Sequence, residues 1–299
     1  YGSVPYNVSY NNNTYKLGYI IDISTHPNFL RKGLISRLEK EAMSRYDIVI
    51  GIGIAGAAYH LHKKTGWIEV NGSYAHNLGL SPLDHPFLAD NVISKNNKLK
   101  SSFDLILKKI FERIYSTYST AVSNFTDINC INDFDRVFVN NNLLVNTNEV
   151  VPVRDLSYWK WRIFDSPNFN QYRSFSINIK DKKVGTIIKL NCVDGIKSID
   201  IMYITPNCNY SSIISLISKI GLWGLGKNYS YMKFYTNDKL LSNKIHKCLK
   251  SFVKKPGFMY YTNNTELSSQ LQKADWKWEI IDGDLETNTK INIDLRGSN

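Results

Sequence analysis

The chain has 299 residues, of which 43% are hydrophobic and 13% aromatic, and it carries a formal net charge of +11. This length exceeds one average domain, so we expect two domains, each with a sizeable apolar core. No stretch reaches the roughly 18 consecutive apolar residues that cross a bilayer, so we expect no membrane span.

The first seventy residues predict alternating strands and helices. Three asparagines at 11–13 favour a turn between two strands, and apolar residues at helical spacing predict the helix that follows. The run of apolar residues and glycines within 47–54 then indicates a strand buried on both faces. In the order two strands, helix, strand, helix, strand, we expect these elements at 1–10, 15–24, 33–46, 47–54, 55–64 and 67–70.

The rest of the chain repeats this order. Residues 71–100 are expected to be loop-rich, and 103–118 form an amphipathic helix that connects or caps the halves. Strands are then expected at 127–131, 172–179, 184–192, 198–204, 229–236 and 258–263, and helices at 133–140, 155–164, 211–225 and 239–253.

The segment 25–38, with the sequence THPNFLRKGLISRL, carries the clearest functional signal. It lies between an apolar strand and a helix whose first amides have no intrahelical acceptor, and the helix dipole adds positive potential there. Gly33 has no side chain to hold a ligand away, and Arg31 and Lys32 add formal charge. The segment therefore predicts a phosphate site, and an ordinary turn with a capping glycine is the alternative.

Two segments match a known pattern in their order and spacing. In the loop the matching residues are Pro27, Phe29, Lys32 and Gly33, and in the helix 58–67 they are Ala58, Lys64, Gly66 and Trp67. These segments resemble the GNAT superfamily of acyl-CoA-dependent N-acyltransferases. The segments 1–5, 22–27 and 154–162 resemble more narrowly a bacterial subgroup with two tandem GNAT-like halves. The resemblance is specific over 1–70 and weaker over 130–285.

The resemblance implies an α/β (α+β) fold of two tandem GNAT-like domains, each a mixed, mostly antiparallel sheet flanked by helices. We expect an N-terminal acyl-CoA-binding domain at 1–95, a connecting helix at 96–125 and a C-terminal domain at 126–299. The first domain shows only the later two-thirds of the GNAT order, so we favour a fragment whose opening strand and first helices lie upstream. The second domain has neither glycine nor cation at 204–210 and lacks the phosphate loop.

The resemblance also implies direct attack of an amine on an acyl thioester, with acetyl-CoA or another acyl-CoA as donor and no metal. His62 is the expected acid, because imidazole donates protons near neutral pH, with Tyr59 as an alternate on the same helix. Asp22 is the expected base, because a carboxylate within an apolar strand needs a functional or hydrogen-bonded role. The residues expected to bind acyl-CoA are Ile23, Ser24, Thr25, Leu30, Arg31, Lys32, Gly33, Leu34 and Ile35.

Each of these residues also has a structural interpretation. His62 stands where many family members carry a catalytic tyrosine, and packing is the alternative for it. A hydrogen bond to a loop is the alternative for Asp22. Leu30, Ile35 and Ala55 depart from the family pattern, which favours a non-catalytic relative as one alternative function.

The partners follow from charge and resemblance together. Residues 151–299 carry 22 Lys and Arg against 13 Asp and Glu, whereas residues 1–150 carry 15 against 13, so the second half favours a polyanionic partner. The implied acceptor is a primary amine of a sugar or small metabolite, with an amino sugar as one candidate. A tRNA-dependent aminoacyltransferase of peptidoglycan-bridge type is the other alternative, and nucleic acid is otherwise not expected.

The remaining sequence signals are weaker. The four cysteines are widely spaced without a metal-ligand pattern, which favours a reduced, cytoplasmic setting. Trp159, Trp161 and Arg162 could line an acceptor site between the halves, although two close tryptophans more often belong to a core. The sequence does not fix the oligomeric state.

Overall fold

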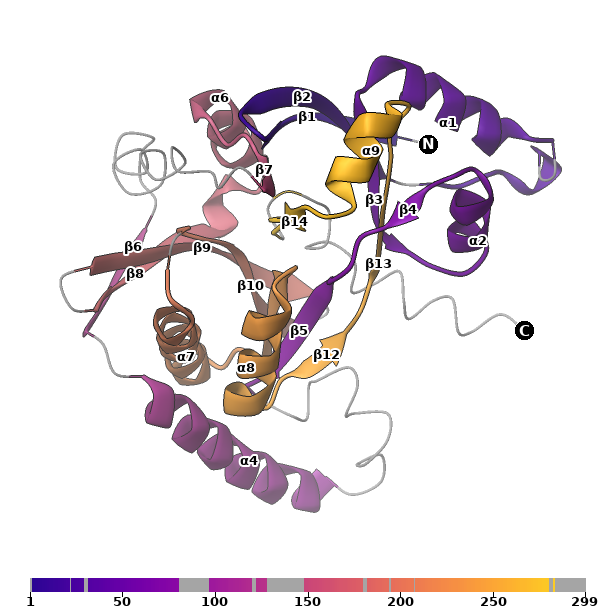
Figure 1. Ribbon diagram of the computed structural model, residues 1–299. Helices are drawn as coiled ribbons and strands as arrows, with labels where there is room; N and C mark the ends of the chain where they lie inside the picture. Colours follow the sequence, from indigo (N-terminus) through magenta and orange to yellow (C-terminus); the bar gives the residue numbers. More distant parts are fainter. Residues whose placement is uncertain are drawn as a thin grey trace.

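The computed structural model describes residues 2–21, 23–29, 32–80, 97–119, 122–127, 148–179, 182–193, 195–206, 208–279 and 282. Within these residues two seven-stranded sheets are flanked by helices (Figure 1). This arrangement confirms the α/β fold class and the two-sheet architecture that the sequence predicts. No described helix is long and apolar enough to cross a membrane.

The first sheet has the strand order β14-β7-β1-β2-β3-β13-β4. A two-residue turn joins β1 to β2, and Asn11 and Asn12 take the positive φ values of 48° and 61° that such a turn needs. The elements of this sheet and its helices are β1 (Gly2–Tyr10), β2 (Asn13–Ile21), α1 (Leu34–Arg45), β3 (Ile48–Ile54), α2 (Gly56–Lys64), β4 (Ile68–Glu69), β7 (Glu149–Pro152), β13 (Gly257–Tyr261), α9 (Thr265–Leu271) and β14 (Asp275–Trp276).

The second sheet has the order β12-β5-β11-β10-β9-β8-β6. Its elements and helices are β5 (Tyr74–Gly79), α4 (Asn97–Tyr118), β6 (Val122–Asp127), α6 (Leu156–Trp159) with a π-helical turn (Lys160–Phe164), β8 (Tyr172–Ile179), β9 (Lys182–Val193), β10 (Ile196–Ile204), α7 (Tyr210–Gly226), β11 (Tyr231–Thr236), α8 (Lys239–Leu249) and β12 (Phe252–Lys254). Most expected elements are confirmed. The expected strand 127–131, apart from Asp127 at the end of β6, and the helix 133–140 lie outside the described residues.

The two sheets repeat one arrangement of strands and helices. An antiparallel pair, β1 and β2, leads into α1 and then into β3, which is parallel to β2. Likewise β9 and β10 lead into α7 and then into β11, which is parallel to β10. Parallel pairing covers only residues 17–19 with 48–50 and 198–200 with 231–233, although all four strands continue further. Each parallel pair therefore separates toward its carboxyl ends.

The halves exchange one strand each (Figure 1). After β4 the chain crosses to the second sheet, where β5 lies between β11 and β12. After β12 it crosses back, and β13 lies between β3 and β4. The sequence boundaries expected at 95 and 125 are therefore not boundaries between the sheets.

The structure corrects two sequence expectations at this exchange. The segment 74–79, expected to be loop, is the inner strand β5 beside the edge strand β12, and its residues are alternately buried and half-buried. The helix expected at 239–253 ends at Leu249, because Lys250 takes a left-handed conformation (φ 54°), and β12 follows. Both strands are short and gain their ladder hydrogen bonds only from strands remote in sequence.

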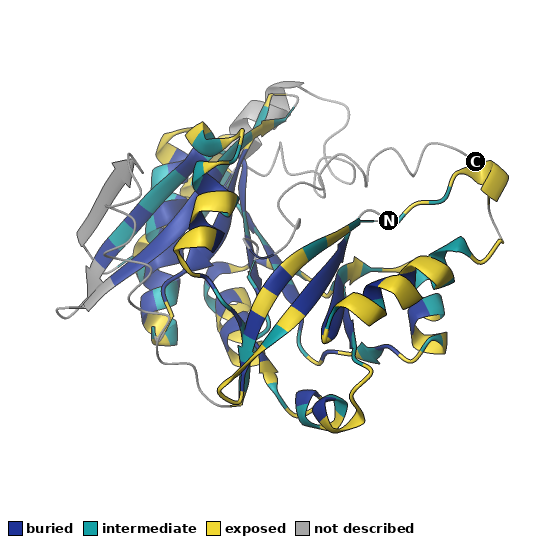
Figure 2. Cartoon of the chain, turned by 90° about the horizontal axis from the view of Figure 1, so that it is seen from above, coloured by how far each residue is buried: buried dark blue, intermediate teal, exposed yellow. Residues whose placement is uncertain are grey.

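Apolar side chains from both sheets form one core between them. The buried residues of this core include Tyr19, Ile48, Met202, Tyr203 and Trp278. Helices α4, α7 and α8 cover a second core on the outer face of the second sheet, and α1 covers a smaller core on the outer face of the first. Figure 2 shows the buried residues along the strands and the exposed ones on the outer surfaces of the helices.

His76 links the exchanged strand β5 to α8 and to the segment after it. The ring is 1% exposed, and its two nitrogens lie 2.8 Å from Ser251 Oγ and 2.9 Å from Ser242 Oγ on α8. Burial, helped by the charge of His246, lowers the pKa of His76 from 6.5 to about 4. The native protein therefore holds this ring neutral in a pH range where the unfolded chain protonates it.

We predict that this difference destabilises the protein in acid. Between pH 6.5 and 4 the unfolded chain binds a proton that the native state does not, so the free energy of unfolding falls by about 3 kcal/mol over this range. The glutamine in His76→Gln cannot be protonated, so this variant should lose that part of the pH dependence of the free energy of unfolding. His60→Gln, at an exposed position, should keep it. Urea unfolding at several pH values measures the free energy of unfolding of both variants. If that free energy changes with pH in His76→Gln as it does in the wild type, the prediction is contradicted.

Candidate functional site

The predicted phosphate loop ends at an open helix N-terminus. Gly33 is the N-cap residue of α1 and takes a left-handed conformation, with φ 69° and ψ 18°. A Cβ atom at this position would meet nothing within 4 Å, so the approach to Leu34 and Ile35 is open. Among the described residues no side chain caps α1, and its first amides are available to an anion.

The loop before Gly33 adds one described cation. A 3₁₀ turn (Pro27–Phe29) follows residues 23–26, and Lys32 Nζ lies 4.8 Å from the centre of the half-exposed Phe29 ring. Of the residues expected to bind acyl-CoA, Ile23, Ser24 and Thr25 precede this turn, and Lys32, Gly33, Leu34 and Ile35 gather at the start of α1. Leu30, Arg31 and the expected base Asp22 lie outside the described residues.

His62 and Tyr59 point in different directions from α2. The His62 ring is 1% exposed, its Nδ1 lies 2.8 Å from Glu39 Oε1 on α1, and it stacks on Trp67 with ring centres 4.3 Å apart. Tyr59 donates a hydrogen bond of 2.8 Å to Glu69. This enclosure of His62 is what the packing alternative requires, and the catalytic roles of both residues stay predictions.

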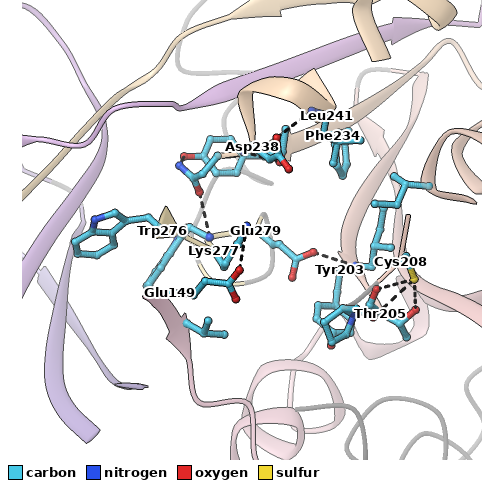
Figure 3. A pocket seen from close by; sticks show the side chains of 18 of the residues that line it. Glu149, Tyr203, Thr205, Cys208, Phe234, Asp238, Leu241, Trp276, Lys277 and Glu279 are labelled. Carbon is cyan, nitrogen blue, oxygen red and sulfur yellow. Dashed lines mark hydrogen bonds and ion pairs between the residues drawn. The ribbon is translucent and has the colours of Figure 1, made fainter. Parts of the chain in front are cut away.

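A cavity of about 330 Å³ lies where the two halves meet (Figure 3). Its walls come from the separating ends of β10 and β11, from β7, and from the segment 276–279, which begins at the last residue of β14. The residues that line it are Glu149, Val151, Arg154, Tyr203, Ile204, Thr205, Pro206, Cys208, Tyr210, Ile213, Phe234, Tyr235, Thr236, Asn237, Asp238, Leu241, Trp276, Lys277, Trp278 and Glu279.

A buried charged cluster forms the floor of this cavity. Arg154 is 5% exposed, pairs through two nitrogens with the fully buried Asp282, and lies 3.0 Å from Glu279. Asp282 also accepts hydrogen bonds from Tyr158 Oη (2.9 Å) and from the Glu279 amide (3.0 Å). The Arg154 guanidinium lies over the Tyr203 ring at 4.9 Å. Asp282 therefore has its acceptor capacity filled, and Glu279 is the outer carboxylate.

This cluster brings one cation together with two carboxylates, which sets the protonation of Glu279. Burial raises the pKa of Glu279 to about 7, Asp282 adds to the rise, and Arg154 and the Ile204 amide (3.1 Å) oppose it. Burial alone would lower the pKa of Arg154, but the carboxylates of Asp282 and Glu279 raise it. The Glu279 side chain, 22% exposed, thus holds or releases a proton near neutral pH.

The other polar side chains of the cavity have partners of their own. Lys277 lies 3.5 Å from Glu149. Asp238 caps α8 by accepting from the amides of Leu240 and Leu241, and Tyr210 donates to it at 2.7 Å. This hydrogen bond to Asp238, with burial, raises the pKa of Tyr210 to about 12. These contacts orient the polar side chains that line the cavity.

The sequence patterns do not predict this cavity. Trp159, expected as a possible acceptor-site residue, is buried in the core beside Tyr203, and Trp161 is 48% exposed. Neither lines the cavity, nor does Arg162. The available signal was the segment 274–282, where the charged residues Asp275, Lys277 and Glu279 alternate with two tryptophans. Among the described residues no group of three or more His, Cys, Asp or Glu is placed to hold a metal.

The Glu39–His62 contact generates a stability prediction. Removing the ring leaves a buried carboxylate without its partner and a void beside Trp67, so His62→Ala should lower the free energy of unfolding by about 3 kcal/mol. His60→Ala, exposed on the same helix, is the matched control. Urea unfolding measures both variants. Unchanged stability in His62→Ala would contradict the packing interpretation.

Comparison with known proteins agrees with this architecture. No family model and no curated protein matches the chain. The structure of Saccharomyces cerevisiae N-myristoyltransferase with bound myristoyl-CoA aligns with a TM-score of 0.56 at 12% identity, over 91% of this chain and 67% of that one. A conserved protein of unknown function from Enterococcus faecalis, described as a probable N-acyltransferase, aligns with a TM-score of 0.51 at 11% identity, over 91% and 60%. The chain thus spans about 60% of the length of the bacterial protein and has the GNAT-type fold that its motifs predict.

Proposed function

We propose that the chain is an acyl-CoA-dependent N-acyltransferase whose N-terminal half holds the donor. The observation that carries this proposal is the open N-terminus of α1, with Gly33 in a left-handed conformation, in the connection between the separating strands β2 and β3. Free amides, a helix dipole and Lys32 favour a diphosphate at this point. The fold shared with N-acyltransferases agrees with it.

The chemistry needs a donor and an acceptor held side by side. The backbone of residues 23–25 would hold the pantetheine amides, and the start of α1 would hold the diphosphate. The amine then attacks the thioester carbonyl, loses a proton, and the departing thiolate gains one. Asp22, His62 and Tyr59 stay the proposed groups for these proton transfers.

Acetyl-CoA is the first donor to test, and an amine of a sugar or small metabolite is the first acceptor class. Myristoyl-CoA is the second donor, because the similar yeast enzyme was solved with it bound. The tRNA-dependent aminoacyltransferase remains the alternative within the same fold, as does a binding protein without turnover.

We predict that acetyl-CoA binds and that Gly33→Glu weakens binding at least about tenfold. The glutamate places negative charge where the diphosphate approaches, and a tenfold loss corresponds to about 1.4 kcal/mol. Gly33→Ala carries the same backbone strain at φ 69° but fits the open space, so it should bind within a few fold of wild type. Calorimetric titration measures all three proteins.

The outcomes separate the alternatives. Equal losses in Gly33→Ala and Gly33→Glu would indicate a strained loop rather than a phosphate site. Binding followed by transfer to a panel of amines, amino sugars included, supports the enzyme, and binding without transfer favours the non-catalytic relative. Tight tRNA binding that weakens steeply with salt, without acetyl-CoA binding, favours the aminoacyltransferase.

A further inference from the structure

The cavity between the halves occupies the place in the second sheet that the phosphate loop occupies in the first. Both lie beyond the parallel pair, β2 and β3 or β10 and β11, and before a helix N-terminus. The chemistry at that helix differs. Residues 204–210 contain neither glycine nor cation. The Asn209 side chain caps α7 by accepting from the Ser212 amide at 2.8 Å, so this N-terminus already has its acceptor.

Within the described walls Asp238 and Glu279 are the carboxylates that charge pairing does not neutralise, and Asp238 already accepts from two α8 amides and Tyr210. Lys277 pairs with Glu149, and Arg154 is held by Asp282 from behind. Arg154 pairs with two carboxylates, those of Asp282 and Glu279. Of these, Glu279 lines the cavity (Figure 3). A cation entering the cavity would supply the charge that this cluster lacks.

Aromatic side chains make up much of the remaining wall. Trp276 and Trp278 come from the segment around β14, Tyr203 from β10, and Phe234 and Tyr235 from β11. Aromatic faces attract ammonium groups, most strongly where water is excluded. A volume of about 330 Å³ lies at the small end of the range for small-molecule sites.

We propose that this cavity binds the protonated primary amine of a small, partly apolar molecule, with Glu279 as its counter-ion. This identification of the ligand as an acceptor rests on the proposed function, but binding itself needs no acyl donor. The neutral-range pKa of Glu279 agrees with the assignment, because an ammonium beside the carboxyl favours the ionised form and releases the proton it holds. Arg154, Asp282 and Tyr203 face Glu279, and the cavity's other titratable side chains are Glu149, Cys208, Tyr210, Asp238 and Lys277.

The test uses benzylamine and its neutral analogue benzyl alcohol in calorimetric titrations without acyl-CoA. We expect the wild-type protein to bind benzylamine at least tenfold more tightly than benzyl alcohol. Titrations at pH 6.5 in buffers of different ionisation enthalpy should show proton release on benzylamine binding, and much less at pH 8. These wild-type comparisons need no variant.

A matched pair of variants assigns the effect to one residue. Glu279→Gln should lose the preference for the amine, with about tenfold weaker benzylamine binding, unchanged benzyl alcohol binding and no proton release. Glu266→Gln, exposed on α9, should behave as wild type. Unchanged benzyl alcohol binding by Glu279→Gln confirms that the variant is folded, whether or not the protein binds acetyl-CoA.

The outcomes keep this inference apart from the proposed function. Equal binding of amine and alcohol by wild type, or an unchanged preference in Glu279→Gln, overturns the amine site even if acetyl-CoA binds. Benzylamine binding that depends on Glu279 in a protein that does not bind acetyl-CoA supports the amine site and sets the acyltransferase function aside.

Discussion

Strands β5 and β13 bind the two halves of the chain into one body, and the other features depend on that exchange. β5 forms six residue pairs with β11 and three with β12, so its removal would split the second sheet beside its parallel pair. β13 does the same in the first sheet between β3 and β4. Because neither sheet is complete without a strand from the other half, the sheets are held face to face over a shared aromatic core.

The cavity is a consequence of this arrangement. β10 and β11 stop pairing after three residues, and β7 and the segment 276–279 close the opening from the side of the first sheet. Arg154 and Asp282 reach the same point from positions 128 residues apart in the chain. A lone guanidinium there would be costly, and Asp282 neutralises it. The additional carboxylate of Glu279 is therefore a feature that structural pairing alone does not require.

Local sequence patterns predict the elements that depend on local interactions. The helices α1, α7 and α8 have apolar faces at helical spacing, and the asparagine turn between β1 and β2 is visible in the sequence. β5 and β12 were missed because their stability comes from remote strands. The start of α1 could be predicted because its glycine and cations are adjacent in sequence. The cavity could not, because its walls come from four separate regions of the chain. His62 shows the limit of matching by position, because the Glu39 carboxylate that encloses it lies on another helix.

The repeated geometry of the two halves carries opposite chemistry. At α1 none of the described side chains caps the N-terminal amides, a glycine leaves the approach open, and Lys32 is beside them. At α7 and α8 the first amides are already satisfied by Asn209 and Asp238, and the charge that faces the cavity is the carboxylate of Glu279. One half is thus suited to an anion and the other to a cation. The proposed transfer from a phosphate-bearing donor to an amine acceptor would use that division, which arises from the different residues beyond each parallel strand pair.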